Sequence, residues 1–162
     1  MLKKILIVDD NKDNRLTLEL LLEEMEDVEL SSASDGLEAL ELCKNSFYDI
    51  IFMDVMMPVM DGITSTKEIK KISPKSMIIA VSALDNEEQK KEMILSGAED
   101  YIRKPIDSSV FVKRTQNYIE LLDLREKRVF DHLASNLFTK ELFNRITTFR
   151  VSNKILGIFY VR

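Results

Sequence analysis

The sequence predicts an α/β protein built on a doubly wound, five-stranded parallel sheet with helices on both faces. Short continuous apolar runs alternate with helical patterns along the first 122 residues. The runs lack hydrophobic–polar alternation, as is typical of strands buried on both faces of a parallel sheet. Strands that alternate with helices form right-handed βαβ units, so we expect helices to cover both faces.

The expected elements follow from these patterns in chain order. Strands are expected at 5–8, 28–33, 50–53, 77–81 and 100–102, with the weaker, more polar second strand at a sheet edge. Helices are expected at 16–25, 36–43, 61–72, 86–96 and from about 108 past 124; Ser34-Asp35-Gly36 opens the second. Such a sheet is flavodoxin-like, of order 2-1-3-4-5, here with an extended C-terminal helix and tail.

The chain is longer than this pattern needs. Residues 1–122 are expected to form one domain, and residues 123–135 a helical linker that continues the fifth helix. Residues 136–162 have two interpretations: the start of a truncated output domain, or a small element that caps or dimerises the first domain. Within this tail a helix is expected at 137–146 and a strand at 155–161.

Composition excludes several classes of protein. The chain is 45% hydrophobic and 31% charged, which is typical of globular proteins. No apolar run approaches the ~20 residues of a membrane span, and the N-terminus lacks a signal-peptide pattern, so we expect a cytoplasmic protein. The single Cys43 cannot form an internal disulfide and is expected in the core. Up to Leu122 there are 15 basic and 24 acidic residues, which argues against nucleic-acid binding there.

Chemically active side chains follow four of the five strands. Asp9-Asp10 follow the first, Asp54 the third, Ser82 the fourth and Lys104 the fifth. Ligands of open α/β sheets bind beyond the carboxyl ends of the strands, where the strand order reverses. These side chains are therefore expected to converge on one edge of the sheet.

The expected cluster favours phosphoryl chemistry. Three carboxylates repel one another, and a hard cation such as Mg²⁺ relieves the repulsion. Carboxylates with Mg²⁺ favour phosphoryl oxygens as the remaining ligands. Asp54 is the best nucleophile because it stands alone between the paired acids and the lysine. Lys104 and Ser82 would then each hold a phosphoryl oxygen.

With these residues at its strand ends, the chain resembles the receiver domain of bacterial two-component response regulators. The resemblance covers about Lys3 to Leu122 in the family's order. The matching segments are Asp9-Asp10, Asp54 with Met57-Pro58-Val59-Met60-Asp61-Gly62, Val81-Ser82-Ala83 and Gly97-Ala98-Glu99-Asp100-Tyr101-Ile102-Arg103-Lys104-Pro105.

The resemblance implies how the metal and the phosphoryl group are held. Asp54 would accept phosphate from a sensor histidine kinase or phosphotransfer protein. Asp10 and Asp54 would bind Mg²⁺ directly, Asp9 through water, and the carbonyl of Met56 would complete the shell. A cis peptide before Pro105 would aim the lysine side chain of residue 104 inward.

The resemblance also implies a conformational switch. Ser82 would move toward the phosphoryl group while Tyr101 turns inward, which alters the face of the fourth helix, fifth strand and fifth helix. That face or the C-terminal helix would support a homodimer. Gly62 is expected to serve a tight turn. The output, the cognate kinase and the pathway are not encoded in these residues.

Two sites beside the acceptor bear on the lifetime of the phosphoryl group. Met56 and Leu84, two residues beyond Asp54 and Ser82, are apolar where some receivers carry groups that position an attacking water. We therefore expect slow self-dephosphorylation.

Other functions have weaker support. A phosphatase with similar acids would usually need a second Asp where Met56 stands. A flavin carrier would need a phosphate loop after the first strand, where Asp9-Asp10 would repel phosphate. The alternative to a free-standing regulator is the N-terminal part of a longer one with an enzymatic output, such as a diguanylate cyclase, whose catalytic part would lie beyond residue 162. Within the present residues, self-phosphorylation and self-dephosphorylation are the only reactions expected.

Overall fold

The computed structural model describes residues 2–83 and 86–158, and within them the side chains except those of residue 138 and of residues 142–158. Strands and helices alternate along these residues. The strands are β1 (Lys3–Val8), β2 (Val28–Ala33), β3 (Ile50–Asp54), β4 (Met77–Ser82) and β5 (Asp100–Arg103). The helices are α1 (Lys12–Glu23), α2 (Gly36–Asn45), α3 (Gly62–Ile72), α4 (Glu87–Leu95) and α5 (Ser108–Ile158).

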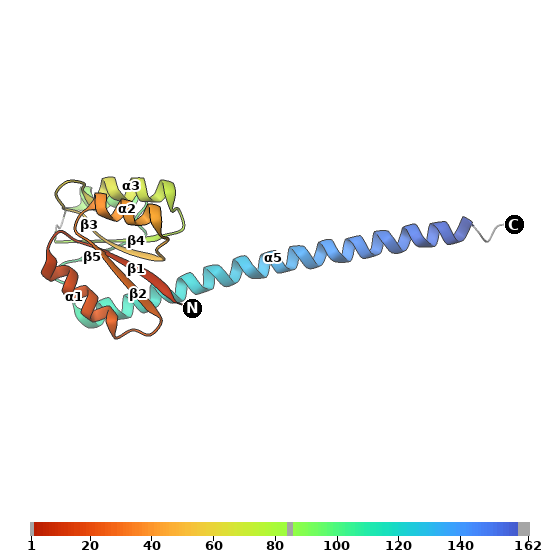
Figure 1. The fold of residues 1–162 in the computed structure, drawn as a ribbon, viewed down its shortest axis with the longest axis horizontal. Helices are drawn as coiled ribbons and strands as arrows, with labels where there is room; N and C mark the ends of the chain where they lie inside the picture. The colour runs from red at the N-terminus through yellow and green to blue at the C-terminus, as the bar shows by residue number, and fades with distance from the viewer. Residues whose placement is uncertain (1, 84–85, 159–162) are drawn as a thin grey trace. The chain divides into compact units, whose positions relative to one another are not determined.

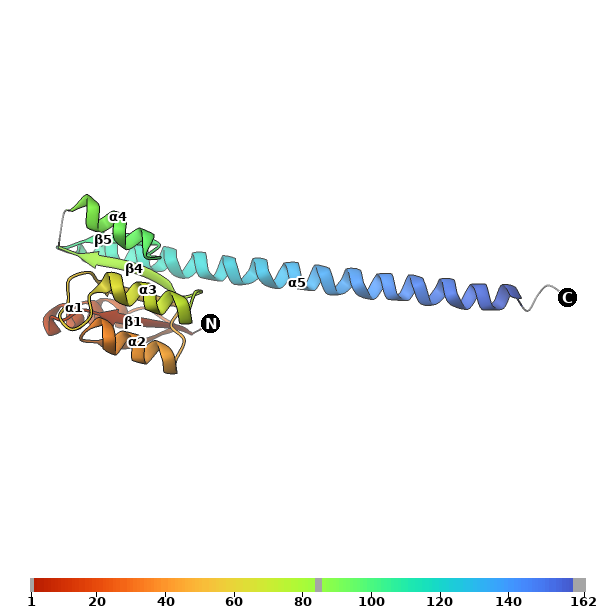
Figure 2. The ribbon, with the colours of Figure 1, turned by 90° about the horizontal axis from the view of Figure 1, so that it is seen from above.

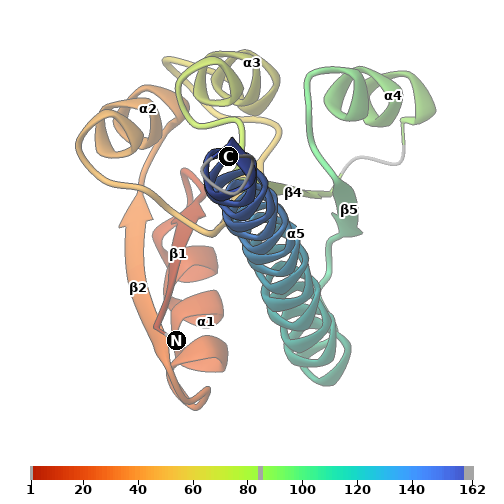
Figure 3. The ribbon, with the colours of Figure 1, turned by 90° about the vertical axis from the view of Figure 1, so that its right-hand side faces the viewer.

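The five strands form one parallel sheet in the order β2-β1-β3-β4-β5, as predicted. Helix α1 and the first turns of α5 cover one face of the sheet, and α2, α3 and α4 cover the other (Figures 1 and 3). Figure 2 shows α2, α3 and α4 side by side over the sheet. The strand order reverses between β1 and β3, so the carboxyl ends of these two strands flank the predicted ligand position.

The core lies in the central strands, whose apolar side chains are buried on both faces of the sheet. The rings of Phe52 on β3 and Phe111 on α5 pack with centroids 4.8 Å apart, which fixes the first part of α5 against the sheet. Strand β2 is only half-buried and lies at an edge, as expected. Cys43 is buried in the core, and its burial raises the pKa of its thiol to about 11.

Short polar caps start the helices directly after the strand-end loops. Asn11, Asp35, Asp61 and Asn86 each accept hydrogen bonds from backbone N–H groups in the first turn of α1, α2, α3 and α4. Such caps satisfy amides that have no partner inside the helix. They therefore hold the loops at the carboxyl edge of the sheet in defined positions.

The chain divides into two compact units, Met1–Ile119 and Glu120–Arg162. The first unit contains the whole sheet. The second is helical through residue 158, and its Val129, Phe130 and Leu133 side chains are exposed. The expected domain end at residue 122 and linker at 123–135 stay predictions. Among the described residues, no helix is long and apolar enough to cross a membrane.

The tail differs from expectation in two respects. The extended C-terminal helix is confirmed, but the separate helix expected at 137–146 is part of α5. The strand expected at 155–161 is wrong for residues 155–158, which are helical, and residues 159–161 lie outside the described part. A short apolar run forms a strand only where a neighbouring strand completes its backbone hydrogen bonds, whereas a helix completes its own.

Candidate functional site

Three carboxylates meet at the carboxyl edge of the sheet. Asp9 and Asp10 follow β1, and Asp54 is the last residue of β3. One side-chain oxygen from each lies within 4.8 Å of the others. Asp9 and Asp54 are buried, at 1% and 7% exposure, whereas Asp10 is exposed. The predicted convergence of the acids is therefore present in the fold.

Lys104 reaches the acids from the loop after β5. It directly follows β5, and the peptide between it and Pro105 is cis, as expected. Its Nζ donates to Oδ2 of Asp9 at 2.6 Å and to Oδ2 of Asp54 at 2.9 Å. One ammonium group thus partly neutralises two buried carboxylates.

The local environment shifts the pKa of both Asp54 and Lys104. Burial raises the pKa of Asp54 above its usual value, although the hydrogen bond and the charge of Lys104 oppose this. Burial by itself would lower the pKa of Lys104, but its hydrogen bonds to Asp9 and Asp54 raise it above the usual value. The lysine is therefore held in its charged form beside a carboxylate that burial makes costly to ionise.

Helix α1 supplies groups that the sequence patterns did not single out. The side-chain amide of Asn14 donates to Oδ1 and Oδ2 of Asp9 at 3.1 and 3.2 Å, and the backbone N–H of Asn11 donates to Oδ1 at 2.9 Å. Arg15 donates to the backbone carbonyls of Asp9 and Asp10 at 2.6 and 3.3 Å. One feature of the sequence could have identified Asn14 and Arg15. Both lie in the first helical turn after Asp9-Asp10, and side chains there face back toward the end of the strand.

The two residues of the switch pair expected from the resemblance lie on the neighbouring strands β4 and β5. Ser82, at the end of β4, is buried, and its carbonyl accepts from the N–H of Lys104 at 2.8 Å. Asp54 pairs in register with Val81, so Ser82 lies one residue beyond the level of Asp54 in the sheet. Tyr101 is half-buried and packs against the core, with Nζ of Lys90 5.8 Å from the centre of its ring. The proposed movements of Ser82 and Tyr101 stay predictions.

Met56 lies two residues after Asp54 and contacts its carboxylate. Its side chain is 56% exposed, and its backbone N–H donates to Oδ1 of Asp54 at 3.3 Å. The expected metal contact of its carbonyl stays a prediction. Leu84, the second site expected to affect phosphoryl lifetime, lies outside the described residues.

Gly62 is required for a reason different from the expected one. It starts α3 and, unlike Gly97, does not have a positive φ; the left-handed residue of this loop is Val59, at φ 68°. A Cβ on Gly62 would come within 2.0 Å of the carbonyl oxygen of Asp54. The glycine thus allows α3 to begin in direct contact with the end of β3.

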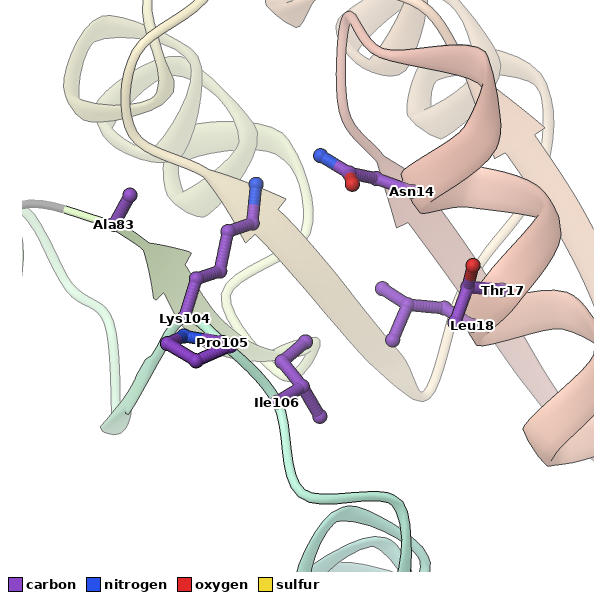
Figure 4. A pocket seen from close by; sticks show the side chains of 7 residues that line it. All are labelled: Asn14, Thr17, Leu18, Ala83, Lys104, Pro105 and Ile106. Carbon is purple, nitrogen blue, oxygen red and sulfur yellow. The ribbon is translucent and has the colours of Figure 1, made fainter.

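A pocket of about 400 Å³ opens next to the cluster. Figure 4 shows its lining, with the side chains of Asn14 and Lys104 on opposite sides and Ile106 below. The remaining lining residues are Thr17, Leu18, Ala83 and Pro105. The pocket is partly apolar and lies between α1 and the loop after β5.

The donor set fits a hard cation. Carboxylate oxygens are the ligands that Mg²⁺ prefers, and the exposed Asp10 leaves one side of the cluster open to the waters that Mg²⁺ retains. The acidic cluster follows β1 and β3, where the strand order reverses, and the lysine follows β5, so the site lies at the ligand-binding edge of a doubly wound parallel sheet.

The chain belongs to the response regulator receiver domain family, whose model matches residues 5–116. It is 38% identical to the chemotaxis protein CheY of Halobacterium salinarum over 105 residues, which are 65% of this chain and 87% of that protein. It is 36% identical to the response regulator PleD of Caulobacter vibrioides over 136 residues, 82% of this chain but 28% of PleD.

A solved structure with the same fold contains a bound metal. The receiver domain of a sensor histidine kinase from Pseudomonas aeruginosa PAO1 has magnesium coordinated in its active-site cleft. It aligns with a TM-score of 0.67 and 28% identity, covering 74% of this chain and 99% of that one. The family and the flavodoxin-like fold predicted from the sequence are both confirmed.

Proposed function

We propose that the protein is a phospho-acceptor response regulator in which Asp54 takes a phosphoryl group from a histidine kinase or phosphotransfer protein. The observation that carries this proposal is the contact of the Asp54 carboxylate with Nζ of Lys104 at 2.9 Å, inside a cluster with Asp9 and Asp10. A carboxylate at this position is both buried and opposed by a fixed cation. That combination suits the binding of a phosphoryl group in line with the acceptor oxygen.

In the transfer step an oxygen of Asp54 attacks the phosphorus atom of a phosphohistidine. The new O–P bond forms as the P–N bond breaks, and the imidazole leaves with the electron pair and takes up a proton from solvent. Lys104 moves from the carboxylates to a phosphoryl oxygen, and the hydroxyl of Ser82 donates to another. Ala83 is small, so it leaves room for the group.

Mg²⁺, when bound, neutralises the charge that develops on the phosphoryl oxygens. Asp10 and Asp54 would hold it directly, Asp9 through water, and Met56 through its carbonyl oxygen. The related receiver domain with magnesium in its active-site cleft supports magnesium as the cation.

Phosphorylation would be read out through Ser82 and Tyr101. As Ser82 moves toward the phosphoryl group, the ring of Tyr101 turns inward and changes the surface of α4, β5 and α5. The ring now lies half-buried beside Lys90 of α4, in position to alter this surface by rotation. The phosphoryl group shifts the equilibrium only by its different affinity for the two states.

The altered surface would control an output or a partner, in the cytoplasm, and the protein would have no turnover substrate. A homodimer could form through α4, β5 and α5 or through the exposed apolar residues of the C-terminal helix. The acidic balance of residues 1–122 disfavours nucleic acid as the partner.

One experiment tests the proposal. The protein is incubated with Mg²⁺ and a small acyl phosphate, and its intact mass is measured before and after hydroxylamine treatment. We expect a hydroxylamine-labile phosphoryl adduct on the wild type and none on Asp54→Asn. Absence of the wild-type adduct, or an undiminished adduct on the variant, would sink the proposal.

A longer regulator is the second candidate. The similarity to PleD extends over 136 residues, beyond the 5–116 of the family model, and PleD is several times longer than this match. Residues 136–162 would then begin an output domain, for which a cyclase is one prediction. An antibody against residues 1–122 would detect a protein larger than 18.8 kDa in native cells, whereas a band at 18.8 kDa would contradict this candidate.

A further inference from the structure

Asp9 is almost completely buried, yet it lies among ionised groups. Its exposure is 1%, and Oδ2 faces the ammonium of Lys104 at 2.6 Å. A buried carboxylate is tolerated only when its oxygens are hydrogen-bonded or paired with charge. The groups that hold Asp9 therefore decide whether Lys104 can leave it.

Asn14 holds the same carboxylate from the opposite side. Its Nδ2 is 3.1 Å from Oδ1 and 3.2 Å from Oδ2 of Asp9, so the amide spans both oxygens. Figure 4 shows Asn14 and Lys104 facing each other across the pocket, one from α1 and the other from the loop after β5. The two residues are 90 positions apart in the chain, so only the fold brings them to one carboxylate.

The position of Asn14 is itself well defined. It lies in the first turn of α1, whose N-cap Asn11 accepts from the backbone N–H of Asp13 and Asn14 at 2.8 and 3.1 Å. Arg15, the next residue, donates to the carbonyl of Asp9 at 2.6 Å. The start of α1 is thus tied to the loop that carries the acids, which limits the freedom of the amide.

The proposed phosphoryl transfer makes a demand on this arrangement. Lys104 now bridges Asp9 and Asp54, but it must turn to a phosphoryl oxygen when Asp54 is the acceptor. Without another donor, its departure would leave Asp9 buried and short of partners. The amide of Asn14 and the N–H of Asn11 remain on Asp9 without Lys104.

We propose that Asn14 is a positioning residue of the phosphoryl site: it holds Asp9 so that Lys104 can exchange this carboxylate for a phosphoryl oxygen. This inference rests on the proposed function. It assigns to the first turn of α1 a role in the rate of transfer, distinct from the docking of a partner. An amide suits the role because it donates without adding charge beside the cation site.

The test compares Asn14→Leu with Thr17→Val in the 162-residue chain. Thr17 lines the same pocket on the same helix, but its hydroxyl donates to the carbonyl of Asp13 instead of to Asp9. With acyl phosphate and saturating Mg²⁺, we expect Asn14→Leu to be phosphorylated about 10- to 100-fold more slowly, as is typical when the partner of a ligand-holding group is removed. Thr17→Val should match the wild type, and Asn14→Gln should recover part of the rate.

A double variant separates positioning from a general loss of structure. If Asn14 acts by letting Lys104 leave Asp9, its effect should depend on Lys104. Adding Asn14→Leu to a Lys104→Met protein should then slow phosphorylation by less than about 2-fold, because the effects of residues that act as a unit are not additive. Circular dichroism and urea unfolding of each variant identify any that fail to fold. A rate of Asn14→Leu within 2-fold of wild type, or an equal loss in the Lys104→Met background, overturns the inference.

Calorimetric titration with Mg²⁺ alone gives a readout independent of transfer. We expect Asn14→Leu to bind Mg²⁺ about 10-fold more weakly than wild type and Thr17→Val. If the wild type forms no phosphoryl adduct, the proposed function is wrong. The Mg²⁺ titration then tests by itself whether Asn14 positions Asp9. Equal Mg²⁺ affinities for Asn14→Leu and wild type then overturn it.

Discussion

The α-carbon of Gly62 lies directly against the backbone of Asp54, so a Cβ there would come within 2.0 Å of the Asp54 carbonyl oxygen. The N–H of Gly62 also donates to the carbonyl of Val55 at 3.0 Å. The start of α3 and the end of β3 are thus locked together at the residue that carries the candidate acceptor. Any side chain at residue 62 must displace one of them.

Gly62→Ala should therefore impair both stability and phosphorylation. The added methyl group meets backbone atoms that cannot rotate away, and we expect unfolding to become easier by about 1–3 kcal/mol. The displaced Asp54 should be phosphorylated at least about 10-fold more slowly, because small misplacements of reacting groups are costly. Urea denaturation and intact-mass kinetics measure the two effects.

Asp61→Ala is the matched control for that variant. It removes the N-cap of α3, whose carboxylate accepts from the N–H of Thr64 at 2.7 Å, and should cost about 1 kcal/mol. Because it adds no atom near Asp54, its phosphorylation rate should stay near wild type. Equal slowing in both variants would show that lost stability, and not the contact with Asp54, causes the effect.

Val59→Gly should stabilise the protein. Val59 is 78% exposed and has φ 68°, a conformation that a β-branched residue adopts only with strain. Glycine removes the strain of about 1–2 kcal/mol at an entropic cost of about 0.5–1 kcal/mol, so we expect a gain of up to about 1.5 kcal/mol. Thermal unfolding measures this gain. Asp27→Gly, at φ 59° in an exposed turn, should change stability less, because aspartate tolerates this region.

Tyr118→Phe should reduce stability at neutral pH more than in acid. Burial alone would raise the pKa of Asp100, but hydrogen bonds from Tyr118 and the Tyr101 amide, with the charge of Arg114, lower it below its usual value. A carboxylate whose pKa is lower in the folded than in the unfolded protein stabilises the fold at any pH above its unfolded-state pKa of about 3.9. This stabilisation is lost as the pH falls through the folded-state pKa.

We expect Tyr118→Phe to cost about 1 kcal/mol at pH 7, a figure reduced for the partial exposure of Asp100. The cost should shrink toward pH 2, because protonation of Asp100 removes the charge that the phenol stabilises. Urea denaturation at the two pH values measures it. A cost that does not depend on pH would show that the phenol contributes through packing alone.

Met56→Asn should shorten the life of the phosphoryl group. The Met56 side chain is exposed beside the acceptor and is unable to orient an attacking water, whereas an amide there can. We expect phosphate loss from purified phosphoprotein to accelerate several-fold, below the roughly 10²-fold lower limit of general acid–base catalysis, because an amide orients the water but does not take its proton. Met56→Leu serves as the control, and a decay rate unchanged by Met56→Asn would remove the argument for slow self-dephosphorylation.

The sequence by itself determined the class of fold and the main members of the site. Apolar runs with intervening amphipathic segments favour a parallel sheet, and parallel strands bring their carboxyl ends to one edge. Asp9, Asp10, Asp54 and Lys104 were therefore predictable from their places after strands. Their convergence needed no knowledge of distances.

Only the tertiary structure decided which groups each of these residues contacts. The sharing of Asp9 by Asn14 and Lys104, and the approach of Gly62 to the Asp54 carbonyl, join segments whose separation in the chain carries no spacing signal. The helical form of residues 155–158 likewise depends on the absence of a neighbouring strand in the described part of the chain. Periodicity reports which face of an element is apolar, whereas contacts between side chains depend on how the elements pack.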